Sequence, residues 1–271
     1  MASIRSLTAH SINNALRYIG IEINSVGTSK RAEWPGFPDV EPWVAQIIEE
    51  TRPFTMTSNE KISALCHAVR YVVRSEIPGD IVECGVWRGG SMMAAAITLL
   101  AEQDLSRTLH LFDTFEGMSP PTEVDRAVLT GKTASSYLKR ADKSSVIWAY
   151  APLETARANL MSTNYPSDRM RFVIGKVEDT LPEKAPDVIA VLRLDTDWYE
   201  STRHELIHLY PRLTVGGVLI IDDYGHWEGA RKAVDEYFNN NQVRILLNRV
   251  DYSARIAVKT ELTRKNYASG E

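Results

Sequence analysis

The stretch IVECGVWRGGS, residues 81–91, decides the fold class of this sequence. Its first residues predict a short buried strand, and the glycine-rich turn that follows leads into the helical pattern SMMAAAITLLAEQ. Glycines let a backbone come close to a ligand, and the start of a helix favours an anionic group. The stretch therefore predicts a nucleotide-binding turn, with a tight structural turn as the alternative.

The spacing of the glycines narrows the choice of ligand. After Gly85 the next glycines are Gly89 and Gly90, which does not fit the G-x-G-x-x-G pattern of dinucleotide sites. No G-x-x-x-x-G-K-[ST] phosphate loop occurs anywhere in the chain. Asp113, at the end of the next apolar run in HLFDTFEG, is placed to accept hydrogen bonds from ribose hydroxyls. A nucleoside without a pyrophosphate fits these features better than NAD or ATP does.

Apolar runs alternate with amphipathic helical patterns over the rest of the chain. Further strands are predicted at TLHLFD, RMRFVIG, VIAVLRLD and GGVLIIDD, and helices at 200–212 and 228–241. The closing runs VRILLNRV and SARIAVKT predict an antiparallel hairpin. We expect an α/β fold with a doubly wound, mostly parallel seven-stranded sheet, this C-terminal hairpin and N-terminal helices.

The domain organisation is predicted from the same patterns. Residues 1–57 read as an N-terminal helical extension with helices at about 4–20 and 42–51, and residues 58–271 as the catalytic domain with an inserted lid at about 114–170. Thr57–Glu60 has the spacing of a capping box, with Thr57 as the cap. The helix that follows carries one apolar stripe, formed by Ile62, Leu65, Val69, Val72 and Val73.

Composition excludes several classes of protein. The 271 residues are 44% hydrophobic and 24% charged with a net charge of −4, which is ordinary for a globular protein and gives no electrostatic reason to bind nucleic acid. No run approaches the roughly 18 apolar residues of a membrane span. The N-terminus lacks the apolar core of a secretory signal, and Cys66 and Cys84 cannot form a disulfide framework. We expect a cytoplasmic enzyme.

Carboxylates follow the predicted strands at the edge where parallel sheets bind ligands. Asp195 ends one strand, and Asp222 and Asp223 end the next. Oxygen ligands clustered in this way suit Mg²⁺, and a cation relieves their repulsion. The alternative for Asp222 or Asp223 is that it caps the following helix.

Several stretches of the sequence resemble the motifs of a known enzyme family. IVECGVWRGGS resembles the first S-adenosylmethionine motif of class I methyltransferases, with the spacing E-x-G-x-x-x-G-x-S. LFDTFEGM, GKVEDTLP, LRLDTDWYEST and LYPRLTVGGVLIIDDYG are similar to motifs of the macrocin/mycinamicin/novobiocic-acid sugar O-methyltransferase family. The resemblance covers roughly residues 55–240. It implies transfer of the methyl group of S-adenosylmethionine to a sugar hydroxyl, free, nucleotide-linked, or on a natural product or glycan, by a homo-oligomer.

The resemblance also implies roles for individual residues. A divalent metal, Mg²⁺ or another, is expected on Asp195, Asp222 and Asp223. Catechol-type relatives use a lysine base three residues after the first metal aspartate, but Trp198 stands there, so we expect Asp195 as the base with Asp197 as the rival. The expected cofactor residues are Glu83, Gly85, Ser91 and Asp113, with Glu178 or Asp179 at the adenine; the expected acceptor residues are Tyr224, His226 and Trp227.

Some of these roles have structural alternatives. Glu83 is as well suited to bonding backbone N–H groups of the turn, and Glu178 or Asp179 to stabilising a helix start. Tyr224, His226 and Trp227 are equally suited to packing. An NAD(P)-dependent oxidoreductase and a non-catalytic S-adenosylmethionine-binding protein stand as alternative functions.

HELIH, residues 204–208, fits the zinc-protease pattern H-E-x-x-H. His204 and His208 share one helix face, about opposite the apolar stripe of that helix, and no downstream motif supplies a third ligand. We interpret the match as accidental.

Overall fold

A computed structural model describes residues 40–141 and 145–261 of the chain, and its centre is a seven-stranded sheet. The strands are β1 (Asp80–Cys84), β2 (Leu109–Asp113), β3 (Met170–Ile174), β4 (Ile189–Leu194), β5 (Leu213–Ile221), β6 (Asn248–Arg249) and β7 (Arg255–Val258), in the order β3-β2-β1-β4-β5-β7-β6. The first five are parallel, and β7 runs antiparallel to both β5 and β6. The predicted fold class is confirmed, although β6 is much shorter than the run VRILLNRV suggested.

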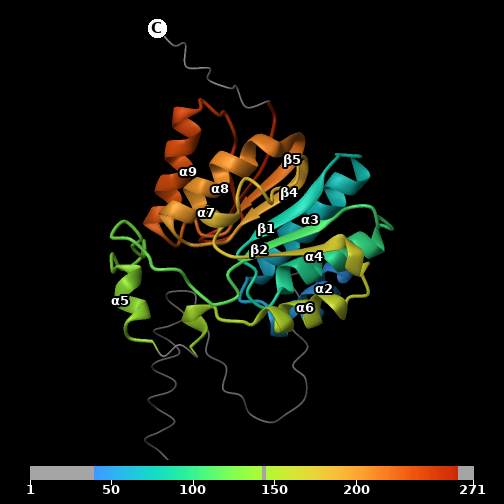
Figure 1. Ribbon diagram of the computed structural model, residues 1–271. Helices are drawn as coiled ribbons and strands as arrows, with labels where there is room; N and C mark the ends of the chain where they lie inside the picture. The colour runs from blue at the N-terminus through green and yellow to red at the C-terminus, as the bar shows by residue number, and fades with distance from the viewer. Residues whose placement is uncertain (1–39, 142–144, 262–271) are drawn as a thin grey trace, which may run out of the picture. The chain divides into compact units, whose positions relative to one another are not determined.

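Helices cover both faces of the sheet (Figure 1). One face carries α3 (Asn59–Arg74), α4 (Gly90–Ala101) and α6 (Leu153–Met161), and the other carries α7 (Val177–Thr180), α8 (Tyr199–Leu209) and α9 (Glu228–Asn240). Successive strand residues alternate between the two cores, as Ile81 and Val82 of β1 do. Burial of a Val, Leu or Ile side chain stabilises the fold by about 1.5–3 kcal/mol. Because helices cover both faces of the sheet, the residues on both sides of a central strand are apolar, and these strands are continuous apolar runs.

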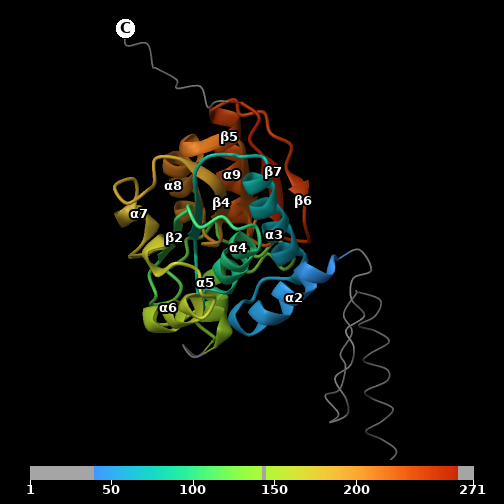
Figure 2. The ribbon, with the colours of Figure 1, turned by 90° about the vertical axis from the view of Figure 1, so that its right-hand side faces the viewer.

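The N-terminal helix of the described region, α2 (Pro42–Thr51), agrees with the helix predicted near 42–51. Val44, Ile47 and Ile48 are buried against α3 and α4, and Figure 2 shows α2 alongside these helices. The helix predicted at about 4–20 lies outside the described residues. The boundary predicted after residue 57 stays a prediction, but α2 shares its core with the helices that follow it.

The start of α3 differs by one residue from the predicted capping box. Ser58, not Thr57, is the N-cap, and its hydroxyl accepts a hydrogen bond from the Lys61 amide at 3.3 Å. The hydroxyl of Thr57 is used elsewhere, because Arg193 Nη2 donates to it at 3.1 Å. The predicted apolar stripe is confirmed, since its first four members are buried and the last is partly buried.

The segment predicted to form a lid has two parts. Its first part contains α5 (Ala134–Leu138) and the short helix η2 (Val146–Trp148), and Ala134 and Leu138 pack against Trp198 and Trp227. Its second part contains α6 and η3 (Ser167–Arg169), and α6 packs against α4 as an ordinary crossover helix. Only the first part, therefore, is placed to border a ligand. In the described part of the chain, no helix is long and apolar enough to cross a membrane.

Candidate active site

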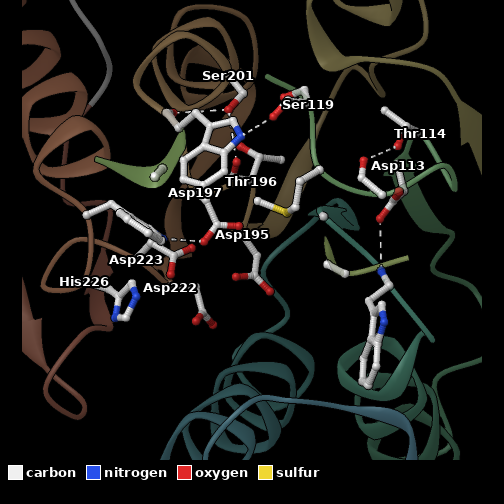
Figure 3. Close-up of a pocket in the computed structure, with 18 of the residues that line it drawn as sticks. Asp113, Thr114, Ser119, Asp195, Thr196, Asp197, Ser201, Asp222, Asp223 and His226 are labelled. Carbon is white, nitrogen blue, oxygen red and sulfur yellow. Dashed lines mark hydrogen bonds between the residues drawn. The ribbon is translucent and has the colours of Figure 1, made fainter. Parts of the chain in front are cut away.

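A cavity of about 410 Å³ lies at the carboxyl ends of the central parallel strands. The cavity is lined by residues at the ends of four strands: Gly85 after β1, Asp113 as the last residue of β2, Asp195 after β4 and Asp222 after β5. Figure 3 shows Asp195, Asp197, Asp222 and Asp223 on one side of the cavity and Asp113 on the other. The cavity therefore has an acidic part and a part next to the glycine-rich turn, joined at the ends of β1 and β4.

The acidic part brings together the three predicted metal ligands. Asp195, Asp222 and Asp223 each offer a carboxylate oxygen within 4.8 Å of the others. Burial raises the pKa of Asp195 and Asp223 well above the ordinary value, and the neighbouring carboxylates raise it further. Asp223 Oδ2 is buried without a hydrogen-bond partner among the described residues. Three carboxyl groups therefore crowd together at this wall, where a cation would relieve their mutual repulsion.

Asp197, the predicted rival base, lies in the same wall of the cavity. Its Oδ1 accepts a hydrogen bond from the Trp227 indole at 2.7 Å, and its backbone has φ +67°. Burial and the adjacent Asp195 raise the pKa of Asp197 to about 8, although the bond from Trp227 opposes the rise. Both candidate bases therefore face the same space.

Two cations that the sequence did not single out touch the acidic cluster. Lys61, near the start of α3, donates to Asp222, and its Nζ lies 4.0 Å from Asp251. Burial opposes the charge of this ammonium, yet Asp222 and the other aspartates raise its pKa. Arg193 of β4 is buried among carboxylates. The sequence did contain a sign of the Arg193 pairing: a single arginine stands inside the apolar run VLRL. A fully buried strand tolerates such a charge only if it is paired.

The glycine-rich turn is built around Asp113. Its Oδ2 accepts hydrogen bonds from the amides of Val86 at 2.6 Å and Trp87 at 3.0 Å, and Oδ1 accepts from Phe115 at 2.7 Å. The predicted ribose ligand thus also holds the turn in place. Gly85 has φ +84°, and a Cβ there would lie 2.0 Å from the backbone oxygen of Asp195, so only glycine fits.

The other predicted residues fall into two groups. Glu178, His226 and Trp227 line the cavity with those already described. Four predicted residues do not line it: Glu83, Ser91, Asp179 and Tyr224.

The surroundings of these four side chains explain why they do not line the cavity, and the roles predicted for them stay predictions. Glu83 is buried, and Arg193 donates to its Oε1 at 2.7 Å. Ser91 is buried in the first turn of α4, 3.4 Å from the Thr57 hydroxyl. The hydroxyl of Tyr224 donates to Asp235 on α9 at 2.8 Å. Asp179 is exposed, one residue beyond Glu178, which does reach the cavity.

Aromatic side chains form the wall opposite the turn. The rings of Trp198 and Trp227 meet edge to face at 5.1 Å, and Tyr137 of α5 meets Trp227 at 6.2 Å. Beside them His226 Nδ1 lies 2.9 Å from the hydroxyl of Tyr252, which comes from the turn between β6 and β7. Such a wall suits the apolar face of a ring-shaped ligand.

HELIH lies on α8, away from this cavity. The rings of His204 and His208 lie 4.4 Å apart, and both side chains are partly buried rather than fully exposed. Glu205 is completely buried and accepts a hydrogen bond from Thr196 at 2.8 Å. Among the described residues, the histidines belong to no group of three potential metal ligands.

The strand order, the glycine-rich turn after β1 and the acidic strand ends together define a class I methyltransferase. Residues 47–258 match the family model described as Macrocin-O-methyltransferase (TylF), and the chain belongs to this family. It is an S-adenosylmethionine-dependent O-methyltransferase. Family membership removes the oxidoreductase alternative and the zinc-protease interpretation of HELIH.

Named relatives are similar over most of the chain. The 8-demethyl-8-(2,3-dimethoxy-alpha-L-rhamnosyl)-tetracenomycin-C 4'-O-methyltransferase of Streptomyces olivaceus is 36% identical over 204 residues, 75% of each chain. The mycinamicin III 3''-O-methyltransferase of Micromonospora griseorubida is 35% identical over 183 residues, 68% of this chain and 69% of the relative. The structure of the O-methyltransferase NovP matches with TM-score 0.66 and 31% identity, covering 77% of this chain and 83% of that one.

Proposed function

We propose that this chain moves the methyl group of S-adenosylmethionine to a sugar hydroxyl of a natural product, with a divalent cation held by Asp195, Asp222 and Asp223. One observation carries the metal part of the proposal: the oxygens of these three side chains lie within 4.8 Å of one another at the cavity wall. The sugar part is supported by a relative whose name specifies a rhamnosyl group on its substrate.

The residues at the cluster fit a divalent cation such as Mg²⁺. All three donors are carboxylate oxygens, and Asp223 Oδ2 is buried without a hydrogen-bond partner in the described part of the chain. Lys61 and Arg193 offset only part of the negative charge of the surrounding acids, which include Asp197. When bound, the cation supplies Lewis acidity, which lowers the pKa of an acceptor hydroxyl and orients its oxygen.

The cofactor fits the other part of the cavity. Gly85 and Trp87 present the turn to the cavity, and Asp113 both organises that turn and lines the space where a ribose would lie. Glu178, at the start of α7, reaches the cavity beyond β3 and is the residue we assign to the adenine. Gly85 lies against the backbone of Asp195, so a cofactor held by this turn would lie beside the acidic cluster.

A carboxylate takes the proton of the acceptor. Trp198 stands where catechol-type relatives place a lysine, and its indole donates to the Ser119 carbonyl at 2.9 Å. Lys61 also lines the cavity, but its ammonium is ion-paired with Asp222 and, being protonated, cannot accept a proton. We assign the base to Asp195, which belongs to the acidic cluster, with Asp197 as the rival; each already accepts one hydrogen bond, from Arg193 and from Trp227 respectively.

The acceptor lies against the aromatic wall. Trp227, Tyr137 and Trp198 offer apolar faces to the C–H face of a sugar ring, while His226 and Tyr252 offer polar atoms beside the acidic cluster. Assembly into a homo-oligomer also stays a prediction.

The test is transfer of a radiolabelled methyl group to a panel of deoxysugar-bearing natural products, with Mg²⁺ and with EDTA. We expect labelled glycoside only with Mg²⁺, and restored transfer when Mg²⁺ is added back. Full activity in EDTA would remove the metal from the proposal. S-adenosylmethionine binding without transfer to any glycoside, with or without Mg²⁺, would support a non-catalytic binding protein.

A further inference from the structure

Arg193 connects four parts of the molecule that meet below the cavity. Its Nη1 donates to Glu83 on β1 at 2.7 Å and to Asp195 after β4 at 2.8 Å. Its Nη2 donates to Asp222 after β5 and, at 3.1 Å, to Thr57 before α3. The side chain is 2% exposed. One guanidinium thus fixes carboxylates from three neighbouring strands.

The chemistry of the group suits this position. A guanidinium is planar and permanently charged, and it presents several N–H groups in a fixed fork, so each carboxylate it binds is held in a defined orientation. Two of the three bound carboxylates, Asp195 and Asp222, belong to the acidic cluster, and Arg193 does not line the cavity itself. Arg193 therefore binds the acidic cluster from the side that faces away from the cavity.

The pairing of β1 with β4 places Glu83 next to Arg193. Glu83 and Arg193 are register partners in β1 and β4, and Glu83 is 1% exposed. Gly85, two residues further along, lies against the backbone of Asp195. Glu83 is the glutamate of the first motif, for which the sequence suggested a contact with the cofactor or the turn, and its Oε1 is bound by Arg193. The ends of β1 and β4 are therefore held together at two positions, by the ion pair of Glu83 with Arg193 and by the contact of Gly85 with Asp195.

We propose that Arg193 is a positioning residue, which holds Asp195 and Asp222 in the orientation that binds the divalent cation. The inference rests on the proposed metal-dependent function. Partners that orient metal ligands typically change metal affinity by about 10–100-fold when they are substituted. Arg193 binds two of the proposed metal ligands, so replacing its guanidinium changes the orientation of both.

The test is calorimetric titration of Mg²⁺ into the full chain, wild type and Arg193→Lys. Lysine keeps the positive charge that Glu83 requires, but one ammonium cannot span Glu83, Asp195 and Asp222 in a fixed plane. We expect Mg²⁺ to bind the variant about 10–100-fold more weakly. In methyl-transfer assays, raising the Mg²⁺ concentration should restore part of the lost rate, while the affinity for S-adenosylmethionine changes less.

Arg107→Lys is the matched control. Arg107 is also a buried arginine, 9% exposed, and donates to Asp104 at 2.7 Å and to the Gly79 carbonyl at 2.6 Å. It precedes β2, at the end of the sheet away from the cavity. We expect this control to lower the melting temperature and to leave the Mg²⁺ affinity unchanged.

Each outcome decides between the alternatives. Equal Mg²⁺ affinity of wild type and Arg193→Lys overturns the positioning role, and so does an equal loss in the Arg107→Lys control, which indicates a general structural effect. A wild-type protein that binds no Mg²⁺ overturns the proposed metal site and this role with it.

A second variant applies if Arg193→Lys does not fold. Thr57→Val removes the 3.1 Å bond to Arg193 Nη2 together with the 3.4 Å contact with the Ser91 hydroxyl, and it preserves every charge. The loss of one hydrogen bond predicts an Mg²⁺ affinity about two- to tenfold lower. Unchanged affinity in Thr57→Val overturns the positioning role in that case.

Discussion

The substitution Asp113→Asn tests whether this carboxylate builds the cofactor turn or only contacts the cofactor. Its two oxygens accept three backbone hydrogen bonds, from Val86, Trp87 and Phe115. Asparagine has nearly the same shape but replaces one oxygen by an NH₂ group. Whichever way the amide is oriented, at least one backbone N–H then faces a donor instead of an acceptor.

The structure sets the size of the effect. With the amide oxygen kept toward Val86 and Trp87, the NH₂ group faces the Phe115 amide, and one charge-assisted bond becomes a buried clash of donors. Such a loss costs about 2 kcal/mol, which lowers the melting temperature of the cofactor-free protein by about 5 °C. A turn held less firmly also binds S-adenosylmethionine more weakly, by about tenfold for each 1.4 kcal/mol lost.

The assay combines thermal unfolding of the cofactor-free variant with calorimetric titration of S-adenosylmethionine. Asp187→Asn is the control, because that side chain is fully exposed and makes only a 3.5 Å contact with Arg212. Both measurements should be unchanged in the control. An Asp113→Asn protein that melts like wild type without cofactor, yet binds S-adenosylmethionine weakly, would refute the structural role and leave Asp113 as a cofactor ligand alone.

Three further predictions follow from the site and its surroundings. Asp195→Asn should lower the single-turnover rate of methyl transfer by about 10²–10⁴-fold and Asp197→Asn by much less; the reverse order would assign the base to Asp197. Burial lowers the pKa of Lys259 from 10.5 to about 8 in the folded protein, so the unfolded chain binds more protons between these values. The free energy of unfolding of wild type relative to Lys259→Met should therefore rise by up to about 3 kcal/mol from pH 7.5 to pH 10.5 in urea titrations, and a difference independent of pH would contradict this. Tyr224→Phe should leave the KM for the acceptor unchanged, because the hydroxyl is bonded to Asp235 outside the cavity, and a raised KM would return Tyr224 to the acceptor site.

The fold, and the edge of the sheet that carries the site, could be predicted from local patterns in the sequence. Strands buried on both faces are continuous apolar runs, and helices repeat every 3.6 residues, so both patterns are local and can be read without contacts. Asp113, Asp195, Asp222 and Asp223 were predictable as a group, because the carboxyl ends of parallel strands always meet at one edge. Gly85 was predictable as a required glycine, although its closest neighbour is the backbone of Asp195.

Which charges pair beneath that edge depends on how distant parts of the chain pack together. Glu83 and Arg193 are 110 residues apart, and their contact depends on the register between β1 and β4, which no local pattern encodes. The same holds for Thr57, whose hydroxyl binds Arg193 instead of capping α3. A buried charge requires a partner, so the sequence indicated that Arg193 has one; which partner it is follows from the folding of distant strands into one sheet.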